Sequence, residues 1–368
     1  MTNTQQSVLE INLNSLEKNY LQIKSLISKN AKKLMAVVKA NGYGSDSIII
    51  AKKLEELGVD YFAVAYASEG VELRNAGIKT PILVLIPQVT SIQKIISNNL
   101  EPSLYSFTVL ERFLRFSKEN KLSQYPIHIK LNTGLNRVGF NSEEYLEAVN
   151  RIIDEKSVSV KSIYSHLAAS EDNSELSFSK TQIELFNSMS SKIISKLGYK
   201  PLLHLCNTSG LINFPEAHYD MVRSGIGLYG FSGSRKANFS PVHRLKSIIS
   251  QIHKVKKNES IGYNRSYFAN KNEKIATIPI GHADGLTRVF GNKKGFVFIN
   301  DKKAFIVGNV CMDVIMVDVT NIECSEGDTA IIFDEIHTAE NLCNSAGTIS
   351  YELISGISAN RISRLIIE

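Results

Sequence analysis

The first two thirds of the chain switch repeatedly between amphipathic stretches and short, wholly apolar runs. After Leu13 the apolar residues recur at steps of three and four, and Asn14 with Glu17 has the spacing of a capping box, which predicts a helix from Asn14. The short apolar runs are typical of strands buried on both faces of a parallel sheet. Eight such strands are predicted, at residues 34–38, 61–65, 82–86, 102–105, 127–131, 160–165, 201–206 and 221–222.

Helical stretches separate most of these strands. Two helices are predicted to end at Gly58 and Gly77, because glycine is favoured just past a helix C-terminus. Eight strands with helices between them, spread over about 230 residues, match an α/β fold of the (β/α)8 TIM-type barrel class. A doubly wound open sheet is the alternative, but no GxGxxG motif follows the first strand, which disfavours its dinucleotide-binding form.

The pattern changes after residue 230. Residues 231–241 are rich in small and polar side chains and are predicted to form a linker. Beyond them the apolar runs are short and rich in β-branched residues, and turns such as Asn300-Asp301 separate them. We therefore predict an N-terminal barrel domain over residues 1–238 and a C-terminal, mostly β domain over residues 239–368, with one short helix near 339–344.

Composition and charge exclude several classes of protein. The 42 Lys and Arg residues exceed the 36 Asp and Glu residues by 6, but the charge is dispersed, so neither nucleic acid nor a membrane is an expected partner. The four cysteines, at 206, 311, 324 and 343, lack CxxC spacing, so no metal site and no disulfide framework is expected. We expect a cytoplasmic location, because we see no signal peptide and no apolar run near the ~18 residues of a membrane span.

Basic and polar side chains gather where the predicted strands end. In α/β barrels the carboxyl ends of the strands carry the active site, and five of the eight predicted strands lead to such residues. Because several cations would meet at one mouth, we expect an anionic ligand such as a phosphate ester. The residues are Lys39, Lys130, Arg137, His166, His204, Asn207, Thr208 and Arg223.

Two glycine-rich turns lie at the same ends of the strands. Tyr43 stands between two glycines, and Gly225 follows Arg223. The N–H groups of Gly225 and Ile226 form a candidate phosphate cradle, since glycine lets the backbone approach an anion closely. Taken singly, each of these residues is more often structural, and it is their coincidence at the strand ends that indicates a site. The histidines interpreted as structural are those at 128, 218, 243, 253 and 337.

Six motifs resemble those of the alanine racemase family, in that family's order and at similar spacing, from about Leu9 to the end. They are KANGYG, SHLAAS, NTSG, DMVRSGIGLYG, GNVCMD and TISYE. The resemblance implies a pyridoxal 5′-phosphate enzyme, built from a barrel and a C-terminal β domain, that interconverts L- and D-alanine and supplies D-alanine for peptidoglycan. It also implies a homodimer whose subunits share each active site.

The same resemblance implies two catalytic residues. Lys39 matches the lysine that forms the Schiff base with the cofactor, and Tyr263, in GYNRSY, matches a second base that the partner subunit contributes. Racemisation removes the α-proton from one face and returns a proton to the other, so it needs a base on each face, while pyridoxal phosphate delocalises the carbanion. Lys39 and Tyr263 are therefore expected to serve opposite faces.

Other residues are implied to bind the cofactor or the substrate. Arg223 matches the arginine beside the pyridine nitrogen, and Arg137 matches a contact to the substrate carboxylate that Lys130, a lysine often carbamylated in the family, orients. The remaining implied residues are His166 and His204 beside Arg223; Tyr43, Asn207, Thr208, Gly225, Ile226 and Tyr351 around the cofactor; and Met312, from the partner subunit, with Asp313 next to it, at the substrate.

The chain departs from the family at four positions, none of which is a catalytic group. Ser45 stands where histidine is usual, Asn132 replaces an aspartate, Thr208 replaces a serine, and His282 replaces a tyrosine that lines the entrance. A serine, lysine or broad-specificity racemase of the same fold is therefore the nearest alternative. The others are a non-catalytic, single-domain carrier of pyridoxal phosphate, a metal-dependent or decarboxylating relative, and a barrel that binds a phosphorylated metabolite without pyridoxal.

Overall fold

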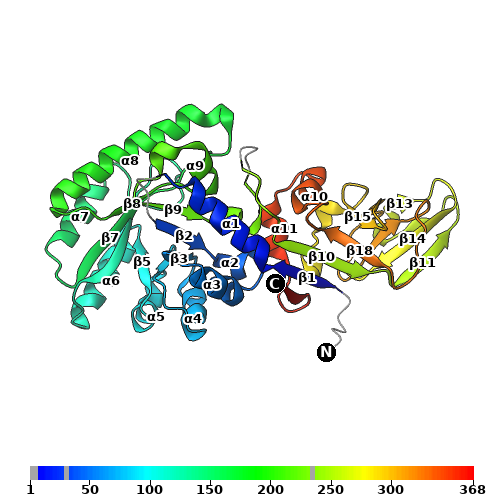
Figure 1. Ribbon diagram of the computed structural model, residues 1–368, viewed down its shortest axis with the longest axis horizontal. Helices are drawn as coiled ribbons and strands as arrows, with labels where there is room; N and C mark the ends of the chain where they lie inside the picture. Colours follow the sequence, from blue (N-terminus) through cyan, green and yellow to red (C-terminus); the bar gives the residue numbers. More distant parts are fainter. Residues whose placement is uncertain (1–6, 29–32, 233–236) are drawn as a thin grey trace.

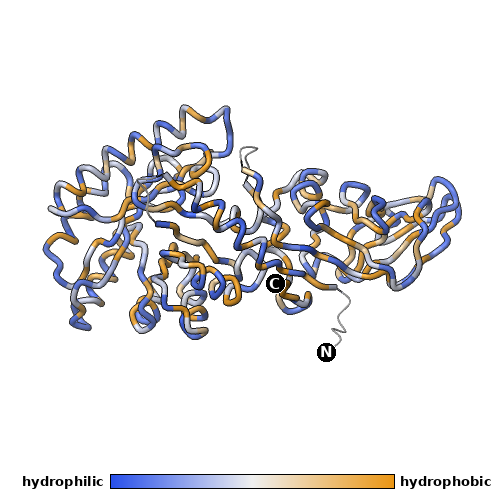
Figure 2. The backbone as a smooth tube through the Cα atoms, in the orientation of Figure 1, coloured by the Kyte–Doolittle hydropathy of each residue, from blue (hydrophilic) through white to orange (hydrophobic). Residues whose placement is uncertain are grey.

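The computed structural model describes residues 7–28, 33–232 and 237–368. These residues form a barrel and a second domain that lie side by side along the long axis of the molecule, with the C-terminus near their junction (Figure 1). Hydrophobic residues follow the strands of both parts, and polar residues are frequent on the outer turns and loops (Figure 2). Within the described residues, no helix combines the length and the apolar character that crossing a bilayer requires.

The barrel sheet contains eight parallel strands in the order β8-β7-β6-β5-β4-β3-β2-β9, which confirms the eight predicted strands and the (β/α)8 class. The two edge strands of this sheet are β8 and β9. The backbone N–H of Arg223 in β9 donates to the backbone carbonyl of Cys206, just past the end of β8, at 3.1 Å, so the sheet is nearly closed. The strands are β2 (Lys33–Val37), β3 (Tyr61–Val64), β4 (Ile82–Val84), β5 (Glu101–Leu104), β6 (Tyr125–Lys130), β7 (Val158–Tyr164), β8 (Leu202–His204) and β9 (Met221–Ser224).

Helices follow the barrel strands and pack their apolar sides against the sheet. Gly58 and Gly77 have φ of +80° and +96°, as expected for residues just past the ends of two helices. The helices of this part are α1 (Leu13–Leu26), α2 (Lys39–Tyr43), α3 (Ser47–Glu56), α4 (Ala67–Asn75), α5 (Ile92–Ser97), α6 (Phe107–Glu119), α7 (Tyr145–Ile153), α8 (Leu176–Leu197) and α9 (Thr208–Asn213).

The start of α1 differs from the prediction. The N-cap is Asn12, whose side chain accepts a hydrogen bond from the Ser15 N–H at 2.9 Å, so the predicted capping box of Asn14 with Glu17 is wrong. The reason is that strand β1 (Val8–Asn12) runs directly into the helix. The last extended residue of the strand is therefore the one that caps the helix.

The second domain is mostly β, as predicted. Its main sheet has the order β16-β15-β18-β10-β1-β19, and a smaller sheet has the order β11-β14-β17. The predicted short helix near residue 339 is α10, whereas α11 was not predicted. The elements are β10 (His243–Ile248), β11 (Gln251–Val255), β12 (Ser260–Ile261), β13 (Tyr267–Phe268), β14 (Glu273–Ile278), β15 (Phe296–Ile299), β16 (Lys302–Phe305), β17 (Ile315–Asp318), β18 (Thr329–Phe333), β19 (Ser363–Ile367), α10 (Ala339–Ala346) and α11 (Ser350–Gly356).

Strand β1 belongs to the sheet of the second domain. It pairs antiparallel with β10 and parallel with β19, so it lies between two strands that follow it by more than 230 residues. The predicted boundary between residues 238 and 239 therefore leaves β1 on the side of the barrel domain, although β1 pairs in the main sheet of the second domain. Every other strand of the second domain lies after this boundary. The core residues Leu9 and Ile11 of this strand are fully buried there.

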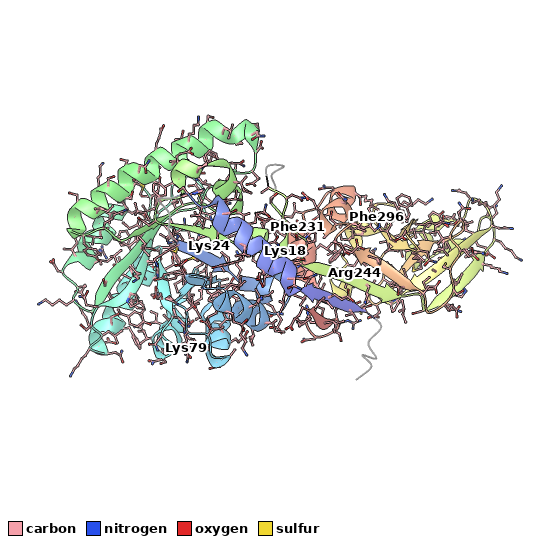
Figure 3. All side chains as sticks on the ribbon, in the orientation of Figure 1. Lys18, Lys24, Lys79, Phe231, Arg244 and Phe296 are labelled. Carbon is pink, nitrogen blue, oxygen red and sulfur yellow. The ribbon has the colours of Figure 1, made fainter. Side chains whose placement is uncertain are left out.

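The segment predicted to be a linker is packed rather than free. Phe231 is buried at the junction of the two domains (Figure 3), and so are Ala237 and Phe239. The Ser240 N–H donates to the Asn19 side chain at 2.7 Å, and the Asn19 amide donates to the Ser240 carbonyl at 2.8 Å. Helix α1 thus binds the described part of this connection, while residues 233–236 lie outside the described residues.

Candidate active site

The interior of the barrel is divided into an apolar and a polar half. Strands β2, β3, β4 and β9 contribute most of the apolar cluster, including Met35, Ala63, Leu83 and Met221, and the ring of Tyr164 from β7 packs against them. On β5 to β8, buried polar residues recur two positions apart and therefore share one face of each strand. They are Glu101, Ser103, His128, Lys130, Ser162, Tyr164 and His204.

A cavity of about 380 Å³ opens at the carboxyl ends of the barrel strands. Eleven of the site residues predicted from the sequence line it, and none of the described residues that line it is acidic. These eleven are Lys39, Tyr43, Lys130, Arg137, His166, Asn207, Thr208, Arg223, Gly225, Ile226 and Tyr351. The coincidence of polar residues at strand ends therefore identified one continuous pocket.

Lys39 is held at the start of a left-handed stretch of backbone. Every residue from Ala40 to Gly44 has a positive φ, between 51° and 82°. The Gly42 N–H donates to the Val38 carbonyl at 3.0 Å, and the Gly44 N–H donates to the Ala40 carbonyl at 2.9 Å. Because left-handed turns cost L-residues about 1–2 kcal/mol each, contacts from elsewhere must hold this one in place.

Two such contacts come from opposite sides. Glu69 on α4 accepts the Ala40 N–H at 2.7 Å and, through its other oxygen, the Ala65 N–H at the end of β3. From the second domain, Arg364 donates to the carbonyls of Gly44 and Ser45 at 2.9 and 3.1 Å. The left-handed turn is therefore fixed to both domains.

The environment of Lys39 favours its neutral amine. Burial lowers the pKa of Lys39, and the nearby Arg137 cation lowers it further, while Glu69 acts in the opposite direction. A neutral lysine amine is a nucleophile and a ligated or protonated one is not. Lys39 is therefore suited to covalent chemistry with a carbonyl group, as is Lys130, the other lysine that lines the cavity.

Arg223 on β9 is the most heavily bonded side chain in the cavity. Its guanidinium donates to the carbonyls of Ser165 and Leu205 at 2.7 and 2.8 Å, and its NH1 lies 2.6 Å from Nδ1 of His204. His166 Nδ1 lies 3.2 Å from NH2 of Arg223. Burial lowers the pKa of Arg223 to about 10, so the side chain is still charged at neutral pH.

The two histidines beside Arg223 are neutral. Burial, followed by the Arg223 cation, holds the pKa of His166 and that of His204 well below the usual value. An arginine can only donate hydrogen bonds, so Nδ1 of His204 must accept one. The guanidinium consequently keeps its charge without an acidic partner among the residues that line the cavity.

Lys130 and Arg137 occupy another wall of the cavity. Lys130 is buried, its Nζ donates to the Leu131 carbonyl at 3.0 Å, and burial together with Arg223 and Arg137 lowers its pKa well below the usual value. Arg137 lies on the loop that follows β6 and is exposed. The side chain of Asn132 caps that loop by accepting the Asn136 N–H at 3.0 Å.

Tyrosines and glycines form the end of the cavity nearest the second domain. The Tyr43 ring packs between Tyr229 and Tyr351, with centroid distances of 4.8 and 6.2 Å. Tyr351 comes from α11, which packs against α2. Thr208 Oγ1 lies 3.1 Å from the Ser224 hydroxyl and accepts the Gly227 N–H at 3.3 Å. These groups offer hydroxyl and amide donors to an anion.

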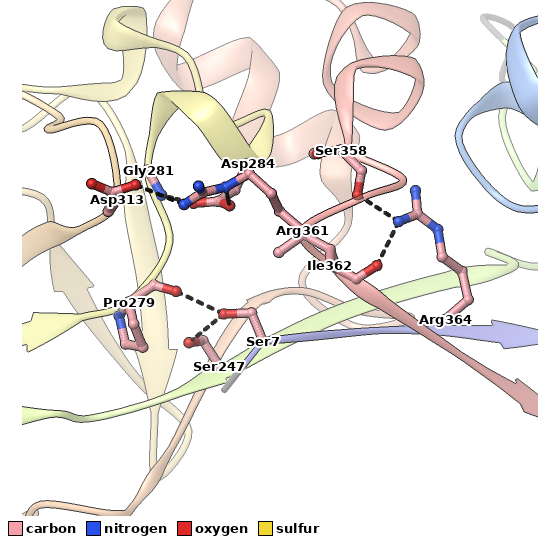
Figure 4. Close-up of polar contacts among 10 residues, drawn as sticks. All are labelled: Ser7, Ser247, Pro279, Gly281, Asp284, Asp313, Ser358, Arg361, Ile362 and Arg364. Atoms are coloured by element: carbon pink, nitrogen blue, oxygen red, sulfur yellow. Dashed lines mark hydrogen bonds and ion pairs between the residues drawn. The ribbon is translucent and has the colours of Figure 1, made fainter. Parts of the chain in front are cut away.

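Four predicted site residues lie outside this cavity. His204 is buried behind Arg223. Tyr263 is 69% exposed on a turn whose neighbours Gly262 and Asn264 have φ of +75° and +60°. Met312 is 57% exposed, and next to it Asp313 accepts a hydrogen bond from Arg361 at 2.7 Å (Figure 4).

The departures from the family have visible partners in the structure. The Ser45 hydroxyl lies 2.6 Å from Nε2 of His243, a buried histidine of β10. His282 lies in a short turn whose backbone is tied to the GNVCMD loop, since the His282 N–H donates to the Cys311 carbonyl at 3.0 Å. His282 is exposed and does not line the cavity of its own chain.

Sequence reasoning missed several residues that shape the site. Tyr164 lines the cavity and stacks on His204 at 4.8 Å, and Arg364 clamps the turn after Lys39. Glu101 and His128, the latter interpreted as structural, belong to a buried polar chain that reaches Arg223. The available signal was the recurrence of polar residues two apart within otherwise apolar strands.

The chain is similar to known proteins over almost its whole length. The alanine racemase N-terminal domain model matches residues 11–233, and the C-terminal domain model matches residues 242–366. Alanine racemase of Carboxydothermus hydrogenoformans is 36% identical over 364 residues, covering 95% of this chain and 96% of that protein.

Two solved structures extend the likeness to the fold. Alanine racemase of Clostridium difficile 630 in complex with cycloserine superposes with a TM-score of 0.88 at 32% identity, covering 99% of this chain and 96% of that one. Alanine racemase of Bartonella henselae with covalently bound pyridoxal phosphate has a TM-score of 0.89 at 26% identity, covering 98% and 99% of the two chains. The chain belongs to the alanine racemase family.

Proposed function

We propose that this protein is an alanine racemase that interconverts L-alanine and D-alanine with pyridoxal 5′-phosphate held in the cavity at the mouth of the barrel. The observation that carries the proposal is the Lys39 amine, whose pKa is lowered in a cavity that Lys130, Arg137 and Arg223 also line and to which no acidic residue contributes. Such a pocket suits a ligand that combines an anionic group with a carbonyl group.

The residues present fit each part of the cofactor. The Tyr43 and Tyr351 hydroxyls and the turn at Gly225 would hold the phosphate, the Arg223 guanidinium would meet the ring nitrogen, and Lys39 would bind the aldehyde carbon. When bound, pyridoxal phosphate delocalises the negative charge that proton removal leaves on the α-carbon of the amino acid. Arg223 remains charged at neutral pH, so it would donate a hydrogen bond at the ring nitrogen and could not accept a proton from it.

We assign the two proton transfers to Lys39 and to Tyr263 of the partner subunit. Lys39 holds the proton on one face of the α-carbon, and the partner subunit's Tyr263 holds it on the other. Support comes from the exposure of Tyr263, 69%, on a turn outside the cavity of its own chain. A side chain that serves a neighbouring subunit in a homodimer is expected to project in this way.

The substrate carboxylate is assigned to Arg137 and to the main chain at Met312 of the partner subunit. Arg137 is exposed at the mouth of the cavity, on the loop that Asn132 caps, so it can reach an incoming amino acid without moving the barrel. A guanidinium and a carboxylate form paired hydrogen bonds of good geometry. Arg137 therefore orients the substrate, and Lys39 acts on its α-carbon.

The reaction is tested by chiral analysis. Purified protein with pyridoxal phosphate is incubated with L-alanine or, separately, L-serine, and the D-enantiomers are measured over time. We expect D-alanine to form and Lys39→Ala to abolish both its formation and the visible absorption band of the lysine-bound cofactor. Equal turnover of serine would favour the broad-specificity alternative, and no racemisation of any amino acid would contradict the proposal.

Sharing of the active site is tested by mixing two inactive variants. In a mixed dimer of Lys39→Ala and Tyr263→Phe chains, one site carries both defects and the other carries none. Random exchange of subunits should therefore restore about one quarter of the wild-type activity, because half the dimers are mixed and each has one intact site. If each chain held a complete site of its own, mixing would restore no activity.

A further inference from the structure

A chain of buried hydrogen bonds leads from Arg223 through the barrel to Glu101. NH1 of Arg223 lies 2.6 Å from Nδ1 of His204, and Nε2 of His204 lies 2.9 Å from the Ser162 hydroxyl. Ser162 lies 2.6 Å from Nδ1 of His128, whose Nε2 lies 2.7 Å from a carboxylate oxygen of Glu101. All five side chains are buried, so water does not compete for these bonds.

The donors and acceptors of this chain have a single direction. Arg223 can only donate, so Nδ1 of His204 accepts and its remaining proton lies on Nε2. That proton is donated to the Ser162 oxygen, which frees the Ser162 hydroxyl to donate to Nδ1 of His128. His128 then carries its proton on Nε2 and donates it to the Glu101 carboxylate. In this arrangement every hydrogen has one acceptor.

Glu101 ends the chain because an ionised carboxylate can only accept. It also accepts a second bond from the Tyr61 hydroxyl at 3.2 Å, and its charge acts on Arg74 and Tyr125 nearby. Hydrogen bonds to an ionised group are about twice as strong as neutral ones. The direction of the hydrogen bonds is therefore the same from both ends, since Arg223 only donates and Glu101, four hydrogen bonds away, only accepts.

We propose that Glu101 and His128 are positioning residues, which keep the Ser162 oxygen free to accept from Nε2 of His204 and through that bond hold the His204 ring and the Arg223 guanidinium in place in the active site. The proposal rests on the proposed function, in which Arg223 meets the ring nitrogen of the cofactor. It extends the functional residues from the mouth of the barrel to the interior of strands β5 and β6. Neither residue lines the cavity.

Removing the Glu101 carboxylate should reverse the direction of the hydrogen bond between His128 and Ser162. In Glu101→Met, Nε2 of His128 has no carboxylate to donate to, so His128 is expected to place its proton on Nδ1 and donate to Ser162. Ser162 then faces two donors, and the bond from His204 weakens. Glu101→Gln keeps one oxygen acceptor for His128 and should preserve the wild-type tautomers.

The tautomers are measured directly by two-bond ¹H–¹⁵N NMR spectra of the holoenzyme labelled with ¹⁵N-histidine. We expect Nε2–H signals for His128 and His204 in the wild type and in Glu101→Gln, and an Nδ1–H signal for His128 in Glu101→Met. Tyr61→Phe is the matched control, because it removes a buried hydroxyl at Glu101 without interrupting the chain. An Nδ1–H tautomer of His128 in the wild type, or no change in Glu101→Met, would overturn the proposal.

Kinetics connect the tautomers to the active site. The racemisation kcat should fall about tenfold in Glu101→Met, the effect of one displaced hydrogen bond, and stay within about threefold of wild type in Glu101→Gln and Tyr61→Phe. A changed tautomer with unchanged kcat would refute the positioning role while leaving the proposed function intact. A wild-type protein without racemase activity would refute the proposed function, and the NMR result would still decide the direction of the chain.

Discussion

The Tyr43 hydroxyl lies 2.2 Å from the point that a Cβ atom on Gly225 would occupy. The two residues belong to turns that follow β2 and β9, which are neighbours in the barrel sheet. Close approach of the two turns narrows the end of the cavity assigned to the phosphate. Only glycine at position 225 leaves room for the tyrosine ring in its present place.

Gly225→Ala is therefore expected to displace Tyr43 and weaken cofactor binding. We expect the dissociation constant for pyridoxal phosphate, measured by fluorescence titration of apoenzyme, to rise at least tenfold, the equivalent of about 1.4 kcal/mol. Gly356→Ala is the matched control, because an added Cβ there meets only the Gly285 carbonyl oxygen, at 3.9 Å. Equal affinities of the two variants would show that the close approach does not matter for binding.

Arg364 holds the turn after Lys39 to the second domain, and Figure 4 shows its hydrogen bonds to Ser358 and Ile362 of that domain. Besides the carbonyls of Gly44 and Ser45, it donates to those of Ile357, Ser358 and Ile362. Arg364→Met leaves these carbonyls without their donor, and we expect the free energy of unfolding to fall by about 2–4 kcal/mol. Urea denaturation followed by circular dichroism measures the change.

Arg361→Met provides the comparison for Arg364→Met. Arg361 lies three residues away and binds the exposed Asp313 carboxylate and the buried Asp284 carboxylate, at 2.7 Å each. The guanidinium is half exposed, and Asp284 keeps the Gly281 N–H as a donor when Arg361 is removed, so we expect a smaller loss of stability than in Arg364→Met. A loss of stability in Arg361→Met as large as that in Arg364→Met would contradict the clamp.

Acid should destabilise the protein through buried histidines. Burial lowers the pKa of His243 to about 3 and that of His204 well below its usual value. The unfolded chain takes up protons near pH 6.5 while the folded chain does not, so stability is complete above that pH and falls as pH drops toward about 3. Each histidine contributes a slope of about 1.4 kcal/mol per pH unit.

His243→Asn isolates one of these contributions. Between pH 6 and pH 5, the dependence of unfolding free energy on pH should be shallower than in wild type by about 1.4 kcal/mol per unit. His253→Asn, at an exposed position, serves as the control and should keep the wild-type slope. Unfolding curves in urea at several pH values give both slopes, and equal slopes for all three proteins would refute the prediction.

Asn309 supports the turn that carries Tyr263. Its side-chain amide donates to the Tyr263 carbonyl at 3.1 Å, and this is a turn in which Gly262 and Asn264 have positive φ. Asn309→Ala should lower the racemisation kcat by roughly three- to tenfold, the effect of about 1 kcal/mol at one hydrogen bond. The melting temperature should change little because the turn is exposed.

The same prediction has an internal control. Asn309 acts through Tyr263, so Asn309→Ala should have no further effect on kcat in a Tyr263→Phe background. Additive losses in the double variant would instead show that Asn309 affects the reaction by another route.

Lys130 is expected to react with carbon dioxide. Its pKa is well below the usual value, so the neutral amine is available to attack the carbon of CO₂ and release a proton, leaving a negatively charged carbamate. When the protein is incubated with ¹³C-bicarbonate, the carbamate carbon on Lys130 should give a ¹³C NMR signal. The signal should persist in Lys39→Ala and vanish in Lys130→Arg. Loss of the signal in Lys39→Ala would show that Lys39 reacts instead, and would contradict the prediction.

The barrel strands were predictable because each is a local pattern of apolar residues. Strand β1 was not, because its five residues carry only two fully buried apolar side chains and its partners lie far away in sequence. The same reason explains the misplaced helix start. Asn12 caps α1 only because residues of the second domain hold the chain extended up to that point.

The cavity was largely predictable because its residues end consecutive strands. The fold of a barrel converts that position in sequence into proximity in space. Glu101 and His128 lie deeper, in the interior, where partners come from four different strands. The two-residue spacing of polar residues within these strands could have indicated that they are buried together, but their roles follow from hydrogen bonds between strands.

Strand β1 also constrains how the protein forms during translation. Ile11 pairs with His243, about 230 residues later, and at 5–20 residues per second the ribosome needs about 10–50 s to make that stretch. Until β10 and β19 are made, Leu9 and Ile11 have no sheet partners, whereas every barrel strand has its neighbours once β9 is made. Strand β1 is thus made before the barrel strands and covered after them, so its apolar side chains stay exposed for longer than those of the barrel.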